Sequence, residues 1–154
     1  MKVVSDTSPI IAFSNLGKLY ILKALFNRIT IPRGVYDELC EGEPFQLEEW
    51  IYIEEISDRS RYNMLRSELD HGESEALVLY LEKRMELLLL DDGEARKVAE
   101  SFGMKITGTG GLLLLARQQG LINSVRSEID KLEKEGEFRL SNSVRNILLQ
   151  AAGE

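Results

Sequence analysis

Short apolar runs alternate with longer amphipathic stretches along this chain, and each change of period predicts a change of secondary structure. Strands are predicted at residues 2–5, 28–31, 50–56, 87–90 and 104–107. Helices are predicted at 9–14, 19–26, from Pro32 onward, at 57–68, 73–83, 93–102 and 109–119, and in three final segments near 123–127, 127–135 and 141–152. Strands separated by helical crossovers predict an α/β fold: a three-layer α/β/α arrangement around a mainly parallel sheet of four to five strands, with a helical C-terminal tail.

Carboxylates gather where these elements meet. Asp6 follows the first strand and Asp91-Asp92 follow the apolar run 87–90, while Glu38 lies in the helix after Pro32. Glu73 and Glu75 lie at the start of the helix at 73–83. Open α/β folds bind ligands at the carboxyl edge of the sheet, and clustered carboxylates there are costly to desolvate unless a cation balances them. The sequence therefore predicts a site for a hard divalent metal ion.

Each acid also has a structural interpretation. Asp6 stands before Thr7-Ser8-Pro9 and is a good helix cap, and one member of the Asp91-Asp92 pair could cap the helix at 93–102. Glu73 and Glu75 could complement the dipole of their helix, an effect of about 0.5 kcal/mol each. Capping accounts for one acid of each pair, so the full set favours the metal site.

Composition describes a soluble globular chain. The 154 residues suit one domain spanning 1–154, with 44% hydrophobic residues, 29% charged residues and 3 Pro. A formal net charge of −7 argues against a broad basic surface for nucleic acid. Local basic residues could still form a track beside the site: Arg28, Arg33, Arg59, Arg61 and Arg66. The single cysteine, Cys40, cannot form a disulfide within the chain or build a thiolate metal site. With no leader and no apolar run long enough to cross a bilayer, we expect a cytoplasmic protein without a membrane partner.

Two further motifs carry weaker signals. His71, the only histidine, follows Asp70 in a predicted loop and reads as a surface residue. The run Gly108-Thr109-Gly110-Gly111 reads chiefly as a tight turn, because it lacks the lysine of a P-loop. Thr109 in this turn and Ser8 beside Asp6 are predicted substrate contacts.

The order of these motifs resembles a PIN domain, the ribonuclease fold found in VapC-like toxins of toxin–antitoxin pairs, and in particular a poorly characterised prokaryotic subgroup. The resemblance spans most of the chain. It rests on Val3-Val4-Ser5-Asp6-Thr7-Ser8-Pro9, Ile31-Pro32 with Val35-Tyr36-Asp37-Glu38, Gly72-Glu73-Ser74-Glu75-Ala76-Leu77, and Leu89-Leu90-Asp91-Asp92 with Ala95-Arg96. By this likeness, Asp6, Glu38, Glu73 and Asp92 form the catalytic and metal-binding quartet, with Asp91 or Glu75 as neighbours that replace or assist a member.

The choice within each pair follows from geometry. Glu75 lies about 200° round the helix from Glu73, so Glu73 is predicted to face the site while Glu75 points elsewhere. Strand alternation likewise separates Asp91 from Asp92.

The resemblance implies an endoribonuclease dependent on Mg²⁺ or Mn²⁺ that cuts single-stranded or looped RNA. Such metals prefer oxygen ligands and can activate water against a phosphodiester, so no side-chain nucleophile is needed. A small antitoxin protein and a homodimer are the other partners it suggests.

Two alternatives remain open. The first is a catalytically silent PIN-like binding module. The second is a receiver-type phosphoacceptor domain, which needs an acidic pair after its first strand, whereas this chain has one acid there and its pair much later.

Overall fold

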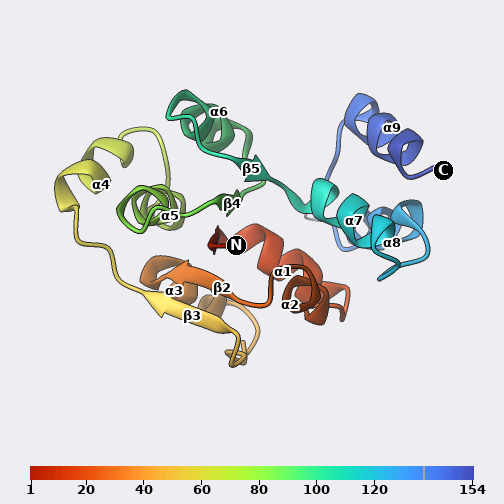
Figure 1. Cartoon of the computed structure of the whole chain (residues 1–154), viewed down its shortest axis with the longest axis horizontal. Helices are drawn as coiled ribbons and strands as arrows, with labels where there is room; N and C mark the ends of the chain where they lie inside the picture. Colours follow the sequence, from red (N-terminus) through yellow and green to blue (C-terminus); the bar gives the residue numbers. More distant parts are fainter. Residues whose placement is uncertain (137) are drawn as a thin grey trace.

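The computed structural model describes residues 1–136 and 138–154, and a five-stranded parallel sheet forms its centre (Figure 1). The strands are β1 (Val3–Ser5), β2 (Ile29–Pro32), β3 (Ile51–Glu54), β4 (Leu87–Leu89) and β5 (Ile106–Thr107), arranged in the order β3-β2-β1-β4-β5. Every neighbouring pair is parallel. The chain builds β2 and β3 on one side of β1 and then crosses to build β4 and β5 on the other. The carboxyl ends of β1 and β4 therefore border the point where strand order reverses, which is where open α/β sheets bind ligands.

Helices cover both faces of this sheet, as predicted (Figure 1). They are α1 (Thr7–Asn15), α2 (Tyr20–Phe26), α3 (Arg33–Glu41), α4 (Arg59–Leu65), α5 (His71–Glu82), α6 (Gly93–Ser101), α7 (Thr109–Gln118), α8 (Val125–Lys134) and α9 (Asn142–Ala151). The pleat sends Val3 of β1 into a core with α1, α2 and α7, and sends Val4 into a second core with α5 and α6. Two apolar layers thus fix the sheet between its helices.

Two predictions about helices are wrong. The predicted break near residue 127 is absent, because α8 runs unbroken from Val125 to Lys134. Ser124 caps it through the Ser127 amide, and Ile129 and Leu132 share its buried face. His71 is not a loop residue but the first residue of α5.

The remaining boundaries agree to within a few residues. Strand β3 is shorter than predicted and lies at the edge of the sheet. Gly103 and Gly120 follow the C-cap residues of α6 and α7, and both take a φ of +75°. Within the described residues, no helix is both long and apolar enough to cross a membrane.

Candidate active site

Asp6 is a buried acid whose side chain does not cap the helix that it precedes. It directly follows β1 and occupies the N-cap position of α1, but its side chain makes no capping hydrogen bond. Among the described residues, its Oδ1 is a buried atom with no hydrogen-bond partner. The pKa of Asp6 is raised to about 8, chiefly by burial and also by the charges of Glu73, Asp70 and Glu38, while the Thr7 amide opposes the shift. The capping interpretation therefore does not describe Asp6.

Glu38 reaches the same place from α3. Its Oε2 accepts a hydrogen bond from the Thr7 hydroxyl at 2.5 Å, and its Oε1 accepts one from the Gly72 amide at 3.0 Å. A Cβ on residue 72 would lie 2.5 Å from Oε1, so only glycine permits this approach. Glu38 thus joins the first turn of α1 to the first turn of α5.

Glu73 combines a structural bond with a place in the acidic group. Asp70 Oδ1 accepts from the Glu73 amide at 2.8 Å, and Glu73 Oε1 accepts from the Asp70 amide at 3.2 Å, which completes a capping box. Burial raises the pKa of Glu73 to about 7, and the charges of Asp70, Asp92 and Glu38 add to the shift while the Asp70 amide opposes it. The dipole interpretation is therefore incomplete, because this carboxyl also interacts with three other acids.

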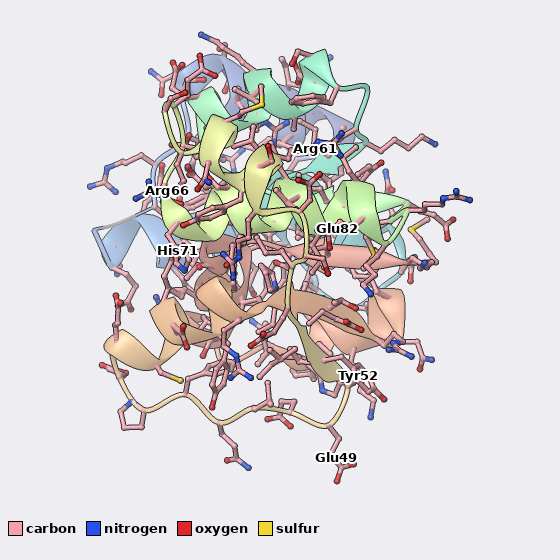
Figure 2. The ribbon with its side chains drawn as sticks, turned by 90° about the vertical axis from the view of Figure 1, so that its left-hand side faces the viewer. Glu49, Tyr52, Arg61, Arg66, His71 and Glu82 are labelled. Carbon is pink, nitrogen blue, oxygen red and sulfur yellow. The ribbon has the colours of Figure 1, made fainter. Side chains whose placement is uncertain are left out.

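Glu75 points away from that group. Its Oε1 accepts from the Gly34 amide at 2.7 Å, and its Oε2 lies 3.7 Å from Arg59 Nη1 and 4.0 Å from His71 Nε2. His71 lies at the start of α5, on the face that α4 crosses (Figure 2). In this conformation the 200° separation places Glu73 and Glu75 in different surroundings.

The two aspartates after β4 are held by different partners. Asp92 is the N-cap of α6 and accepts from the Ala95 amide at 2.9 Å. Asp91 accepts from the amide and the hydroxyl of Thr109 at 2.7 and 2.6 Å. Thr109 has no exposed surface, so in this conformation its hydroxyl positions Asp91 rather than reaching substrate.

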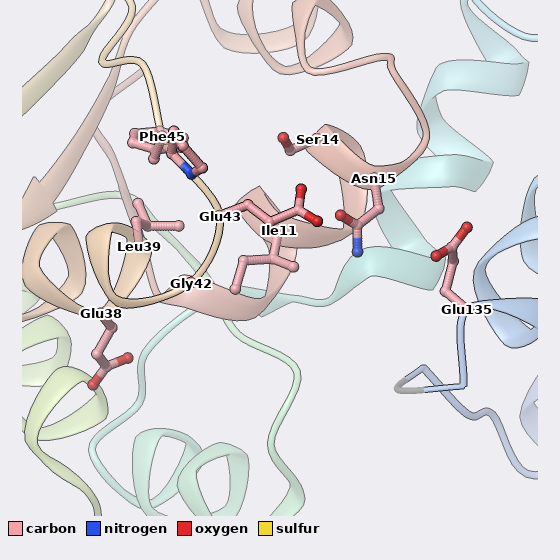
Figure 3. A pocket seen from close by; sticks show the side chains of 10 residues that line it. Ile11, Ser14, Asn15, Glu38, Leu39, Gly42, Glu43, Phe45 and Glu135 are labelled. Atoms are coloured by element: carbon pink, nitrogen blue, oxygen red, sulfur yellow. The ribbon is translucent and has the colours of Figure 1, made fainter.

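Two adjoining cavities open onto these acids. One, of about 490 Å³, is lined by the exposed Ser8, by Asp70, Glu73, Asp91 and Asp92, and by apolar side chains that include Phe138 and Leu140. The other, of about 390 Å³, includes Glu38 and Phe45 (Figure 3). Both are lined by Ile11, Asn15 and Glu135, so they lie side by side over α1. Cavities of this size suit small ligands.

The donor set suits a hard divalent cation. Oxygen ligands are what Mg²⁺ and Mn²⁺ prefer. A cation would offset both the burial and the repulsion between acids that raise the pKa values of Asp6 and Glu73. The unpartnered Oδ1 of Asp6 is the clearest sign of an unmet ligand. Within residues 1–136 and 138–154, however, no three His, Cys, Asp or Glu side chains converge closely enough to hold a metal ion as they stand. Binding would require these carboxylates to move together.

One member of the acidic group is absent from the predicted set. Asp70 lines the cavity with Glu73, and its charge acts on both Asp6 and Glu73. The Asp-x-x-Glu spacing of Asp70 and Glu73 is a capping-box signature, and it was the available signal. Gly72 within it reads instead as a helix breaker.

Comparison with known proteins supports the fold. A family model described as a PIN domain, DUF3368, matches residues 2–154. A search of curated proteins found no relative of the chain. The match covers nearly the whole chain, and the five-stranded parallel sheet between helices is consistent with the fold of that family. This chain is therefore a member of the PIN-domain family.

Proposed function

We propose that this protein is an endoribonuclease that depends on Mg²⁺ or Mn²⁺ and cuts single-stranded or looped RNA. PIN domains are generally nucleases that use divalent metals and act on RNA. The observation that carries the proposal to this chain is Asp6, a buried carboxylate with an unpartnered oxygen among other acids at the switch point of the sheet.

In this proposal Asp6, Glu38, Glu73 and Asp92 hold the metal, with Asp91 beside them. The four come from β1, α3, α5 and the end of β4, so they fix the site relative to all the central elements. Thr7 and Gly72 orient Glu38, and Thr109 orients Asp91. These hydrogen bonds restrict the movement of the two carboxylates.

The bound metal would activate a water molecule and stabilise the charge that develops on the cleaved phosphodiester. The protein supplies position and a partly desolvated surrounding, and none of its side chains needs to attack the phosphate. Ser8 is exposed on the cavity wall two residues from Asp6, where its hydroxyl can donate to a phosphate oxygen. A strand whose bases are unpaired can bring its phosphate into such a crevice more readily than a duplex can.

A catalytically silent PIN domain is the second candidate. Carboxylate oxygens of Glu38, Glu73 and Asp92 already accept hydrogen bonds from protein groups, and the described side chains of the site do not assemble a ligand set for a metal ion. Both observations favour this second candidate.

If the chain is instead an active toxin held by a small antitoxin, expressing it alone should stop cell growth. Expression of Asp6→Asn would then leave growth unchanged.

Metal binding distinguishes the metal-dependent ribonuclease from the catalytically silent PIN domain. Calorimetric titration of the parent with Mn²⁺ should show binding that Asp6→Asn combined with Asp92→Asn removes. Chelator should also abolish RNA cleavage by the parent. If the double variant binds Mn²⁺ as well as the parent does, the metal lies elsewhere and the proposed site is wrong.

A further inference from the structure

Arginine and tyrosine side chains gather beside the acidic site, on α4 and the start of α5. The Arg59 guanidinium lies 5.4 Å from the centre of the Tyr62 ring. The Tyr62 hydroxyl is 2.6 Å from His71 Nδ1, and the two rings meet edge to face at 5.6 Å. A cation, an aromatic ring and an imidazole thus form one connected group.

A second cation–aromatic pair lies on α3. The Arg33 guanidinium lies 5.8 Å from the centre of the Tyr36 ring, one turn along the helix, and pairs with Glu55 at 3.5 Å. The side chains of Arg33, Arg59 and His71 are 49%, 60% and 45% exposed. A guanidinium carries five N–H donors, so pairing with one carboxylate leaves donors for a further ligand.

Buried Glu75 connects the two pairs. Its carboxylate accepts the Gly34 amide from α3 and faces Arg59 of α4 and His71 of α5. A Cβ on residue 34 would lie 2.7 Å from His71 Nε2, which shows how closely α3 approaches the imidazole. Arg59 and His71 therefore face a buried carboxylate, and Arg33 is linked to it through the amide of the neighbouring Gly34.

This group lies at the same edge of the sheet as the acids. Arg33 directly follows β2, and Arg59 begins the helix after β3. His71 adjoins Gly72, whose amide holds the Glu38 carboxylate. On the face drawn in Figure 2, His71 and Arg66 lie on one side, while Tyr52 and Glu82 lie on the other. The cations thus stand next to the acidic centre, at the end of the sheet where its strands finish.

We propose that Arg33, Tyr36, Arg59, Tyr62 and His71, the Arg/Tyr cluster, bind single-stranded RNA on its way into the acidic crevice. The inference rests on the proposed function and names where its substrate is held. Arginine pairs with phosphate through parallel N–H donors, and aromatic rings stack on unpaired bases. The rings of Tyr36 and Tyr62 are half-buried, so each offers part of its surface to a base. A chain of net charge −7 needs such a local cationic surface to hold RNA near its own carboxylates.

The chain offers a matched control pair. Arg28 lies 3.9 Å over the Tyr52 ring and resembles the cluster pairs in chemistry. It precedes β2, at the opposite, amino edge of the sheet. Arg28→Ala therefore removes the same kind of exposed cation without touching the proposed path.

Binding of a fluorescent single-stranded RNA should be followed by anisotropy over a range of salt, with chelator present so that nothing is cut. Arg33→Ala and Arg59→Ala should each weaken binding roughly tenfold, the loss of one charge-assisted contact. Each should also reduce the salt slope by about 0.7, the value for one phosphate contact on a single strand. Tyr36→Leu should weaken binding without changing that slope, whereas Arg28→Ala should bind as the parent does.

The outcomes separate this inference from the proposed function. Arg59→Ala removes a neighbour of buried Glu75, so its melting temperature is compared with that of the parent. If Arg59→Ala does not fold, the result for Arg33→Ala, at an exposed position, decides whether the cluster binds RNA. If Arg33→Ala binds RNA as tightly as Arg28→Ala, or if the parent shows no salt-dependent binding, the Arg/Tyr cluster is not the RNA site. If Arg33→Ala loses RNA binding but the parent never cleaves RNA when metal is present, the Arg/Tyr cluster is upheld and the proposed nuclease function is overturned. Tighter binding of an acidic peptide than of RNA would assign the surface to a protein partner.

Discussion

Glu75 and Gly34 are hydrogen-bonded across the interface of α5 and α3, with the carboxylate Oε1 2.7 Å from the amide nitrogen. A second bond runs in the opposite sense, from the Gly72 amide of α5 to Glu38 of α3 at 3.0 Å. Each helix thus supplies a glutamate to the free first-turn amides of the other. The exchange fixes the position of Glu38, so residues outside the acidic quartet should control the geometry of the site.

Gly72→Ala tests this control. The added Cβ would lie 2.5 Å from Glu38 Oε1, so the carboxylate must move and metal affinity and cleavage should both fall at least tenfold. Because the Cβ meets the far end of a flexible side chain that can turn aside, the variant should lose little stability, and its effect should fall on the site. Gly93→Ala is the matched control, because a Cβ there meets nothing within 4 Å and activity should be retained. Equal activity in the two variants would show that Glu38 is not needed where it stands.

The Glu73 and Glu75 pair should divide by chemistry. Glu75→Gln keeps an acceptor for the Gly34 amide and should retain most cleavage, whereas Glu75→Ala leaves that amide without its acceptor at a cost of about 1–3 kcal/mol. Glu73→Gln should fold but lose Mn²⁺ binding and activity, because it removes a charge from the proposed metal site. Calorimetry and thermal melts of the three proteins check these expectations. An active Glu73→Gln would exclude Glu73 as a ligand.

Substitutions of Asp91 and Asp92 should also differ in how much activity they remove. Asp92→Ala removes a proposed ligand and the cap of α6, so activity should be lost and stability should fall by about 1 kcal/mol. Asp91→Asn keeps one acceptor for Thr109 and should lower activity less. Cleavage rates measured at saturating Mn²⁺ make the comparison. A larger loss for Asp91→Asn would make Asp91 the direct ligand.

Stability in chelator should fall as pH rises. Asp6 has a folded pKa of about 8 against an ordinary 3.8, and Glu73 about 7 against 4.5, so the folded protein keeps protons that the unfolded chain has released. Between the unfolded and the folded pKa of each group, the retained proton lowers the free energy of unfolding by roughly 1.4 kcal/mol per pH unit. Below pH 4 the effect vanishes because both states are protonated. Thermal melts between pH 4 and 8 should therefore show a slope that Asp6→Asn reduces.

Metal should flatten that slope, because carboxylates bind the ion in their charged form and binding releases the protons that the folded protein otherwise keeps. The difference in stability between samples with Mn²⁺ and samples with chelator should therefore grow with pH. If Asp6→Asn has the same slope as the parent in chelator, Asp6 does not hold its proton in the folded state.

The acids of the site follow from the sequence where they border regular strands. Asp6 and the Asp91-Asp92 pair come directly after apolar runs, and parallel strands bring such positions to one edge of the sheet. Glu38 lies inside a helix, so the sequence could name it as a candidate but could not show what holds it, because its partner amide at Gly72 lies 34 residues away. Local patterns carry no information about such a contact.

Other features were hidden by competing local signals. Gly72 reads as a helix breaker, yet it stands in the first turn of α5 because Asp70 and Glu73 form a capping box around it. That box also makes His71 helical and sets it against Tyr62. The role of Thr109 depends on β5 and α7 meeting Asp91, a tertiary contact that the glycine-rich turn does not reveal.

Cleavage of a labelled single-stranded RNA by purified parent and Asp6→Asn, each with Mn²⁺ and with chelator, tests the central claim most directly. The account predicts endonucleolytic products only from the parent with metal, and an Asp6→Asn protein that folds but does not cut. Cleavage by Asp6→Asn at the parental rate, or by the parent in chelator, would contradict a metal-dependent ribonuclease centred on Asp6.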